Sequence, residues 1–154
     1  MDPDSDPALQ SLLAHYLSMP PVAAMRLRIA GADGDSLRLC APLAAHVNDK
    51  GCAFGGSLVS LMTLAGWGVA TLALERAGLR ADVFVAASEV RYRAPLFADL
   101  EAVARADAAE LAAFVAALRD GGRASLNLDA RVPLPEGGSA CDMRSRYVAI
   151  AKAA

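Results

Sequence analysis

The segment between Lys50 and Glu75 carries no charged side chain, and this feature constrains the fold more than any other. The run is long enough for a membrane-spanning helix. However, glycine, serine and threonine recur along it, and its flanks show the pattern of soluble β-structure. A helix that is apolar on all sides is also what a sheet wrapped around it requires. We therefore expect a buried helix from about Phe54 to about Ala77, ended by Gly78, and not a membrane span.

Length and composition narrow the class of protein. A chain of 154 residues suits one compact domain, which we expect to cover residues 1–154. With 55% hydrophobic and 21% charged residues the chain is too apolar to be disordered. A net charge of −2 supplies no basic surface, so nucleic acid is not an expected partner.

The cysteines and the first residues bear on the compartment. Three widely spaced cysteines match neither a disulfide scaffold nor a zinc site. The acidic N-terminus lacks the layout of a signal peptide. We therefore predict a cytoplasmic protein. No set of His, Cys and carboxylate residues has metal-ligand spacing, so no metal is expected.

Hydrophobic periodicity predicts the other elements. Asp6-Pro7 is typical of a helix start, and Met19-Pro20-Pro21 of the end of that helix. The predicted strands are Ala24–Ala30, a partner around Leu37–Leu39 across a turn at 31–35, then Val83–Ala94, Glu101–Ala106, Arg123–Val132 and Arg144–Ala151, with a helix at Ala109–Arg119. This order indicates an α+β domain in which a mostly antiparallel sheet curls around the long helix. Its exposed edge strands favour a symmetric dimer.

A polar loop, His46–Ser57, leads directly into the apolar helix and is the candidate site. Gly55 and Gly56 leave backbone N–H groups uncovered where the helix dipole is positive, which suits a polarised carbonyl. Asn48 and Asp49 lie just upstream, where they could activate or orient water. The alternatives are close helix–sheet packing for the glycines, and turn formation or capping for Asn48 and Asp49.

The first turns of the helix present a candidate substrate surface. Gly56, Ser60, Thr63 and Trp67 share one face, which could line an acyl channel, although Ser60 would equally suit a packing seam. Phe54 and Ser57 flank the glycines and are predicted to contact substrate. A Cys–His pair of His46 and Cys52 is disfavoured, because no third group is available to orient it.

The run N-D-K-G-C-A-F-G-G-S at 48–57, followed by L-A-G-W-G at 64–68, resembles the putative thioesterase domain family of the hotdog fold. In some bacteria this domain follows an acetyltransferase-like domain. The resemblance covers nearly the whole chain. It implies a curled antiparallel sheet around a central helix, an acyl-thioester substrate on coenzyme A or acyl carrier protein, no separate cofactor, and a homodimer or dimer of dimers with sites at the subunit interface.

The resemblance also implies roles for individual residues. Asn48 and Asp49 match the loop position that acts at the reacting carbon, and Gly55-Gly56 matches the helix start that polarises the thioester carbonyl. Many hotdog thioesterases carry a carboxylate about two turns into the helix, where this chain has Thr63. That departure leaves a non-catalytic acyl-thioester-binding module as the main rival to a hydrolase. It disfavours a hotdog dehydratase or hydratase, which needs a histidine and such a carboxylate.

Four arginines are candidate clamps for the phosphates of coenzyme A. Arg91 and Arg93 lie on the strand after the central helix, and Arg123 and Arg146 on later strands. Their alternative is an ordinary solvated strand face. The expectation is therefore an acyl-thioester hydrolase in which Asn48, Asp49, Gly55, Gly56 and Thr63 form the reacting centre, while Phe54, Ser57, Ser60, Trp67, Arg91 and Arg93 bind substrate.

Overall fold

The computed structural model describes residues 3–153, which form a single curled sheet around a long helix. The helices are α1 (Pro7–Leu17), α2 (Pro20–Ala23), α3 (Gly55–Arg76) and α4 (Ala108–Gly121), with a 3₁₀ turn at Leu43–Ala45. The strands are β1 (Arg28–Asp33), β2 (Ser36–Ala41), β3 (Ala81–Tyr92), β4 (Leu100–Arg105), β5 (Arg123–Pro133) and β6 (Ser139–Ala151).

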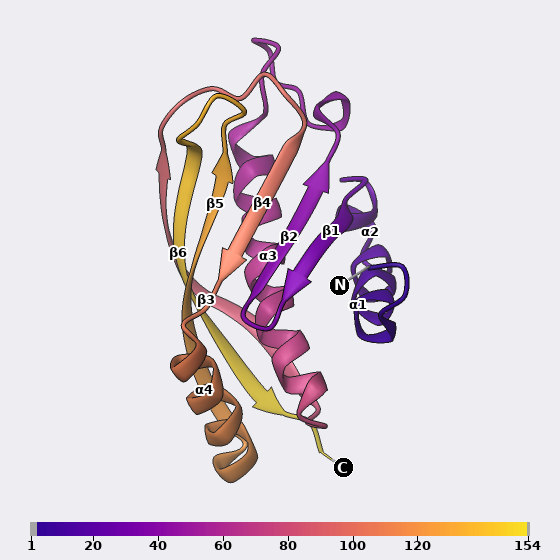
Figure 1. Ribbon diagram of the computed structural model, residues 1–154, viewed down its shortest axis with the longest axis vertical. Coiled ribbons are helices and arrows are strands. Elements are labelled where there is room, and N and C mark those ends of the chain that lie inside the picture. The colour runs from indigo at the N-terminus through magenta and orange to yellow at the C-terminus, as the bar shows by residue number, and fades with distance from the viewer. Residues whose placement is uncertain (1–2, 154) are drawn as a thin grey trace.

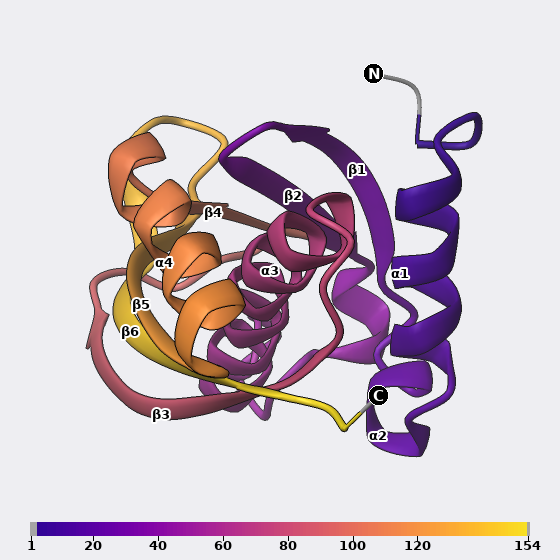
Figure 2. The ribbon, with the colours of Figure 1, turned by 90° about the horizontal axis from the view of Figure 1, so that it is seen from below.

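The sheet has the order β1-β2-β4-β5-β6-β3, and every neighbouring pair is antiparallel. Figure 2, which looks along α3, shows the strands curving around this helix while α1 covers its remaining open side. Helix α4 links β4 to β5 and packs against β5 near the C-terminal end of α3 (Figure 1). This arrangement is the hotdog architecture expected from the sequence.

Helix α3 is enclosed by the sheet over much of its surface, and ten of its 22 residues are buried. Leu61, Met62 and Ala65 are fully enclosed, and they pack with side chains that the sheet directs inward. By length and composition alone α3 could cross a membrane, but more than half of its apolar window lies inside the protein here. The predicted core helix is confirmed, with bounds within one residue of those expected.

Two buried tyrosines fix the middle of α3 from opposite sides. The Tyr16 hydroxyl of α1 donates to the Leu64 carbonyl at 2.6 Å, and the Tyr147 hydroxyl of β6 donates to the Thr63 carbonyl at 2.8 Å. Burial raises the pKa of both phenols, so both remain neutral hydrogen-bond donors. Position 66 of α3 carries glycine because a Cβ there would lie 2.3 Å from the Tyr147 hydroxyl oxygen.

The N-terminal hairpin differs from its prediction. The segment expected to begin a strand at Ala24 instead follows the short helix α2, because Pro20 and Pro21 occupy the first helical positions, where a missing N–H costs nothing. Arg26 then takes a left-handed φ of 54°, which prevents an extended strand before Arg28. Strand β1 in turn runs on to Asp33, so the turn is shorter than the predicted 31–35.

The C-terminal strand is longer than predicted. Strand β6 begins at Ser139 and not at Arg144, because it lies between β5 and β3 and forms a ladder with both along its length. The preceding turn is correspondingly tight, with positive φ at Gly137 and Gly138. The predicted helix at 109–119 and the inward-facing residues of β5 are confirmed.

Candidate active site

The start of α3 offers free backbone donors. Phe54 is the N-cap residue and has an apolar side chain that cannot cap. Within residues 3–153, no side chain or carbonyl accepts a hydrogen bond from the N–H of Gly55 or Gly56. The first N–H groups of a helix have no intrahelical partner and lie at the positive end of its dipole. This end of α3 can therefore donate to a carbonyl oxygen or to an oxyanion.

The loop before α3 is held by the side chain of Asn48. Its Oδ1 accepts from the N–H of Lys50 at 2.8 Å and of Cys52 at 3.2 Å, and its Nδ2 lies 3.3 Å from the Cys52 sulfur. Asp49 lies at the tip of the loop, where its carboxylate contacts the Lys50 ammonium at 2.8 Å and is 82% exposed. Neither Asn48 nor Asp49 lines the two cavities along α3 described below, so the role predicted for this pair stays a prediction.

His46 is buried at the base of the same loop. Its Nε2 lies 2.7 Å from the Met25 carbonyl oxygen, and its Nδ1 lies 2.8 Å from the Ser57 hydroxyl. The imidazole thus links the end of α2 to the first turn of α3. The disfavoured Cys–His pair does not form, since the sulfur of Cys52 interacts with Asn48.

A cavity of about 610 Å³ opens beside the first two turns of α3. Helix α2 and the following turn form its opposite wall, where Pro21, Val22 and Met25 contribute apolar surface. The cavity brings together most of the predicted helix residues: Phe54, Gly56, Ser57, Ser60 and Thr63, with His46 between the loop and the helix. Gly55 faces the other side of α3, towards the ring of Tyr92.

A second cavity, of about 480 Å³, continues along α3 beneath α1. It shares Thr63 and Leu64 with the first cavity and contains Trp67. The indole N–H of Trp67 donates to the Val83 carbonyl at 2.8 Å, and its ring packs against His15 and Tyr16. The predicted face of α3 therefore lines two adjoining cavities, whose combined length follows the helix for about three turns.

Thr63 lies between these cavities, at the position where the resemblance noted in the sequence leads us to expect a carboxylate. Its hydroxyl is directed towards the Met143 sulfur at 4.0 Å. No Asp or Glu lines the first cavity. Among residues 3–153, no group of three or more His, Cys, Asp or Glu side chains could hold a metal ion. Any base at the first cavity therefore comes from a histidine or from a second chain.

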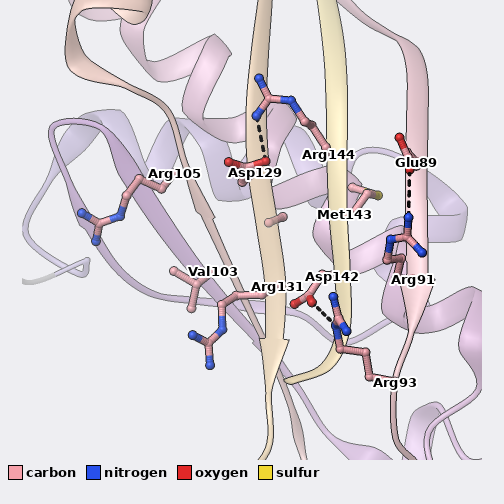
Figure 3. A pocket seen from close by; sticks show the side chains of 11 residues that line it. Glu89, Arg91, Arg93, Val103, Arg105, Asp129, Arg131, Asp142, Met143 and Arg144 are labelled. Carbon is pink, nitrogen blue, oxygen red and sulfur yellow. Dashed lines mark hydrogen bonds and ion pairs between the residues drawn. The ribbon is translucent and has the colours of Figure 1, made fainter. Parts of the chain in front are cut away.

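Arg91 and Arg93 lie away from the first cavity. They line a third cavity, of about 530 Å³, on the face of the sheet opposite α3 (Figure 3). Arg91 pairs with Glu89, and Arg93 forms a charged hydrogen bond with Asp142. Burial alone would raise the pKa of Asp142, but the hydrogen bonds from Arg93 and Ser139 hold it below the ordinary value. Figure 3 shows the acidic and basic side chains interleaved, so this face has no single charge sign.

Sequence reasoning does not identify the roles of His46 and Met25 in this site. The spacing of residues relates His46 only to Cys52, and the alternating pattern places Met25 in a strand. The contact of His46 with Ser57 has no spacing signature, because it forms across the turn from the loop into α3. The one available signal is that His46 opens the polar loop whose last residue is Ser57.

Comparison with known proteins gives the same fold. A protein from Chlorobaculum tepidum TLS, described as of unknown function, has 29% sequence identity and a TM-score of 0.87, covering 93% of this chain and 94% of its own. A putative thioesterase from Shewanella oneidensis has 26% identity and a TM-score of 0.84, covering 93% and 97%. A thioesterase from Haemophilus influenzae, at 18% identity and a TM-score of 0.71 over 90% and 88%, shows the fold alone.

The sequence itself matches one family over nearly its full length. The model of the family described as "Putative thioesterase (yiiD_Cterm)" matches residues 8–151. That range contains nearly all of α1 and the whole sheet, as well as the loop and the cavities along α3. By this match, this chain belongs to the putative thioesterase family of the hotdog fold.

Proposed function

We propose that this chain hydrolyses acyl thioesters, with the thioester carbonyl bound at the start of α3. The observation that carries the proposal is the uncapped start of α3, where Gly56 borders a cavity with apolar walls. Donors preorganised at the developing oxyanion are usually the largest contribution to acyl-transfer catalysis, about 2.7–4 kcal/mol for one donor. Membership of a family described as putative thioesterases supports the same reaction class.

The two cavities along α3 suit an acyl chain. From Gly56 to Trp67 the helix rises roughly 16 Å, at about 1.5 Å per residue. Aliphatic and aromatic side chains line the part of the walls nearest the start of α3, among them Val22, Met25, Leu64 and Trp67, while Glu75, Arg80, Asp82 and Lys152 add charged groups to the second cavity. An acyl chain with its carbonyl at Gly56 would pass Thr63 and reach Trp67. The other end of the substrate, on coenzyme A or acyl carrier protein, would extend towards solvent.

A second copy of the chain is proposed to complete the site. Strand β3, of 12 residues, is the last strand of the sheet, so within residues 3–153 no further strand pairs with its outer edge. Large apolar side chains along it are exposed, including Val85 at 45% and Tyr92 at 63%. Tyr92 lies against Gly55, so a copy that pairs along β3 would reach the start of α3. An antiparallel pairing of β3 with itself would remove the open edge of both copies.

Within such a dimer the loop of Asn48 and Asp49 is proposed to deliver water. The carboxylate of Asp49 can act as a base only where a second surface covers it, because it is largely exposed in one chain. Asn48 would act chiefly by holding the loop, since its Oδ1 already accepts two backbone hydrogen bonds.

The reaction is tested directly with acetyl-, octanoyl- and palmitoyl-coenzyme A and a chromogenic reagent for free thiol. We expect release with at least one of them. Asp49→Asn should lower kcat about 10²-fold or more if this carboxylate activates water. It should leave the melting temperature unchanged, because the side chain is exposed. Asn48→Asp, which keeps the Oδ1 acceptor, is the matched control for the loop. Absence of thiol release with all three substrates would refute the proposal.

The dimer is tested by light scattering of the eluted protein. We expect twice the chain mass for the native protein and a shift to the monomer for Val85→Glu, which places a charge on the unpaired strand. Ser125→Glu on β5, also exposed, should leave the dimer intact. A native monomer would contradict this part of the proposal.

A non-catalytic acyl-thioester-binding module remains the second candidate, because one observation favours it. Thr63 stands where a carboxylate would act, and no Asp or Glu lines the first cavity. Calorimetry separates the two: binding of octanoyl-coenzyme A without release of thiol would support the binding module.

A further inference from the structure

The first cavity contains a hydroxyl nucleophile already hydrogen-bonded to a base. Of the side chains that line it, only the imidazole of His46 can act as a general base, and the hydroxyl groups are those of Ser57, Ser60 and Thr63. Only Ser57 contacts the imidazole, at 2.8 Å from its Nδ1. This distance falls within the range expected of a nucleophile and its base.

The direction of proton transfer follows from the second contact of His46. A carbonyl oxygen can only accept a hydrogen bond, so the contact with Met25 places the proton of the neutral imidazole on Nε2. Nδ1 then carries the lone pair, and the Ser57 hydroxyl donates to it. The Met25 carbonyl therefore orients the ring, as the third group of a catalytic triad does.

Resting on the proposed thioester hydrolysis, we infer that Ser57 is the nucleophile of this site, with His46 as its general base and the Met25 carbonyl as the group that orients His46. This assignment supplies what Thr63 cannot, because it places a base at the cavity without a carboxylate on α3. Ser57 is the third residue of α3, so its hydroxyl lies within the turn whose N–H groups stabilise negative charge.

The reaction would proceed in two steps. In the first, the Ser57 oxygen bonds to the thioester carbon while its proton passes to His46 Nδ1. The carbon–sulfur bond then breaks, and the same proton goes to the leaving sulfur as the thiol departs. In the second, water that the loop of Asp49 positions attacks the acyl-serine ester and gives a proton to His46 Nδ1. The carbon–oxygen bond to Ser57 breaks, the proton returns to the serine oxygen, and the acid leaves. No other reactant is needed.

The burial of His46 and its two contacts distinguish it from the other histidine. His46 is 6% exposed, and both of its ring nitrogens are engaged. His15 is exposed on α1, and its ring packs against Trp67. Ser57 is half-buried and borders the cavity, so a substrate carbon can approach its oxygen.

The first experiment uses the native protein and needs no variant. A fluorophosphonate probe, which reacts with serine hydroxyls activated by histidine, is incubated with the protein, and the modified peptide is identified by mass spectrometry. We expect modification at Ser57. A second sample is mixed with octanoyl-coenzyme A, quenched in acid and examined for an octanoyl adduct on the same residue. If Ser57 carries neither the probe nor an octanoyl group, the inference is overturned.

Variants then separate catalysis from folding. Ser57→Ala should lower kcat/KM about 10³-fold or more, while Ser125→Ala should not change it. His46→Gln keeps an amide that can donate to Met25 but cannot take the serine proton, so it should abolish probe labelling. Circular dichroism checks the fold of each variant, and labelling of the native chain decides the question if His46→Gln fails to fold.

The outcomes distinguish the two proposals. If the native chain releases thiol and Ser57→Ala does so at a similar rate, the serine nucleophile is refuted while hydrolysis stands. If the native chain releases no thiol but Ser57 is labelled, the pair is active and the proposed thioester hydrolysis is refuted. Labelling of Ser57 together with loss of thiol release in Ser57→Ala supports both.

Discussion

The contact between Tyr147 and Gly66 gives a prediction about the stability of α3. A Cβ added at Gly66 would lie 2.3 Å from the Tyr147 hydroxyl oxygen, 2.8 Å from the ring carbon that bears it, and 2.9 Å from a methyl group of Leu128. Tyr147 is fully buried and its hydroxyl is fixed on the Thr63 carbonyl, so it cannot move aside cheaply. Overpacking of this kind costs about 1–3 kcal/mol.

Alanine is also more favourable than glycine inside a helix, so Gly66→Ala regains about 1 kcal/mol of stability. Because the contact distance is so short, we take the upper end of the overpacking cost, about 3 kcal/mol. The free energy of unfolding then falls by about 2 kcal/mol in total. For a chain of this size that corresponds to a fall in Tm of roughly 4–8 °C. Tyr147→Phe removes one buried hydrogen bond and should lower stability by about 1 kcal/mol.

The double variant tests the reasoning. Phenylalanine at 147 removes the atom that the new methyl group would meet first, so Gly66→Ala with Tyr147→Phe should cost about 1 kcal/mol less than the two single losses added. Thermal melting followed by circular dichroism measures each value. Gly121→Ala, at the exposed end of α4 with no atom within 4 Å of its added Cβ, is the control and should not destabilise. Additive losses, or a Gly66→Ala protein as stable as wild type, would refute the argument.

Two further predictions concern the second cavity and the outer face of the sheet. Trp67→Ala should enlarge the cavity under α1 and shift the preferred acyl chain to a longer one, measured as kcat/KM for octanoyl- against palmitoyl-coenzyme A; an unchanged preference would place the chain elsewhere. Asp142→Asn should lower Tm at pH 7. Because the folded pKa of Asp142 lies below its unfolded value of about 3.9, its contribution is present above that pH and is lost as the pH falls through the folded pKa. The Tm difference from wild type should therefore shrink in acid, and a constant difference would contradict this.

Local pattern is enough to predict most of the fold. The charge-free run locates α3, and the alternation along Arg123–Val132 gives both β5 and its inward face. These features are set by residues a few positions apart. The errors lie where distant chain segments decide the outcome: β6 begins earlier than its own pattern indicates because two neighbouring strands extend its ladder.

The arginines show the same limit at the level of side chains. Alternation along β3 and the residue that follows it correctly separates Arg91 and Arg93 from Val90, but alternation alone does not determine which face of the sheet contacts the helix. The strand register determines the face. Val90 pairs with Met143, whose sulfur contacts Thr63 of α3, so the arginines lie on the opposite face of the sheet. A clamp formed by them could reach a substrate at Gly56 only around the edge of the sheet.

Asn48 and Ser57 show why residue type in a loop does not determine a role. Both carry groups suited to catalysis, and both lie within the polar run that marks the candidate site. In the folded chain the Asn48 oxygen accepts from two backbone N–H groups, so a substitution that removes it acts first on the shape of the loop. The Ser57 hydroxyl instead donates to Nδ1 of a buried histidine.

Paired substitutions at the two positions separate a structural role from a chemical one. Loss of thiol release in Asn48→Ala but not in Asn48→Asp would indicate that Asn48 holds the loop, because aspartate keeps the accepting oxygen. At position 57 the alanine variant should fold normally and release no thiol, whereas Ser57→Cys, which places a sulfur nucleophile beside His46, should keep part of the activity. Equal activity in Ser57→Ala and Ser57→Cys would show that the group at this position does not attack the substrate.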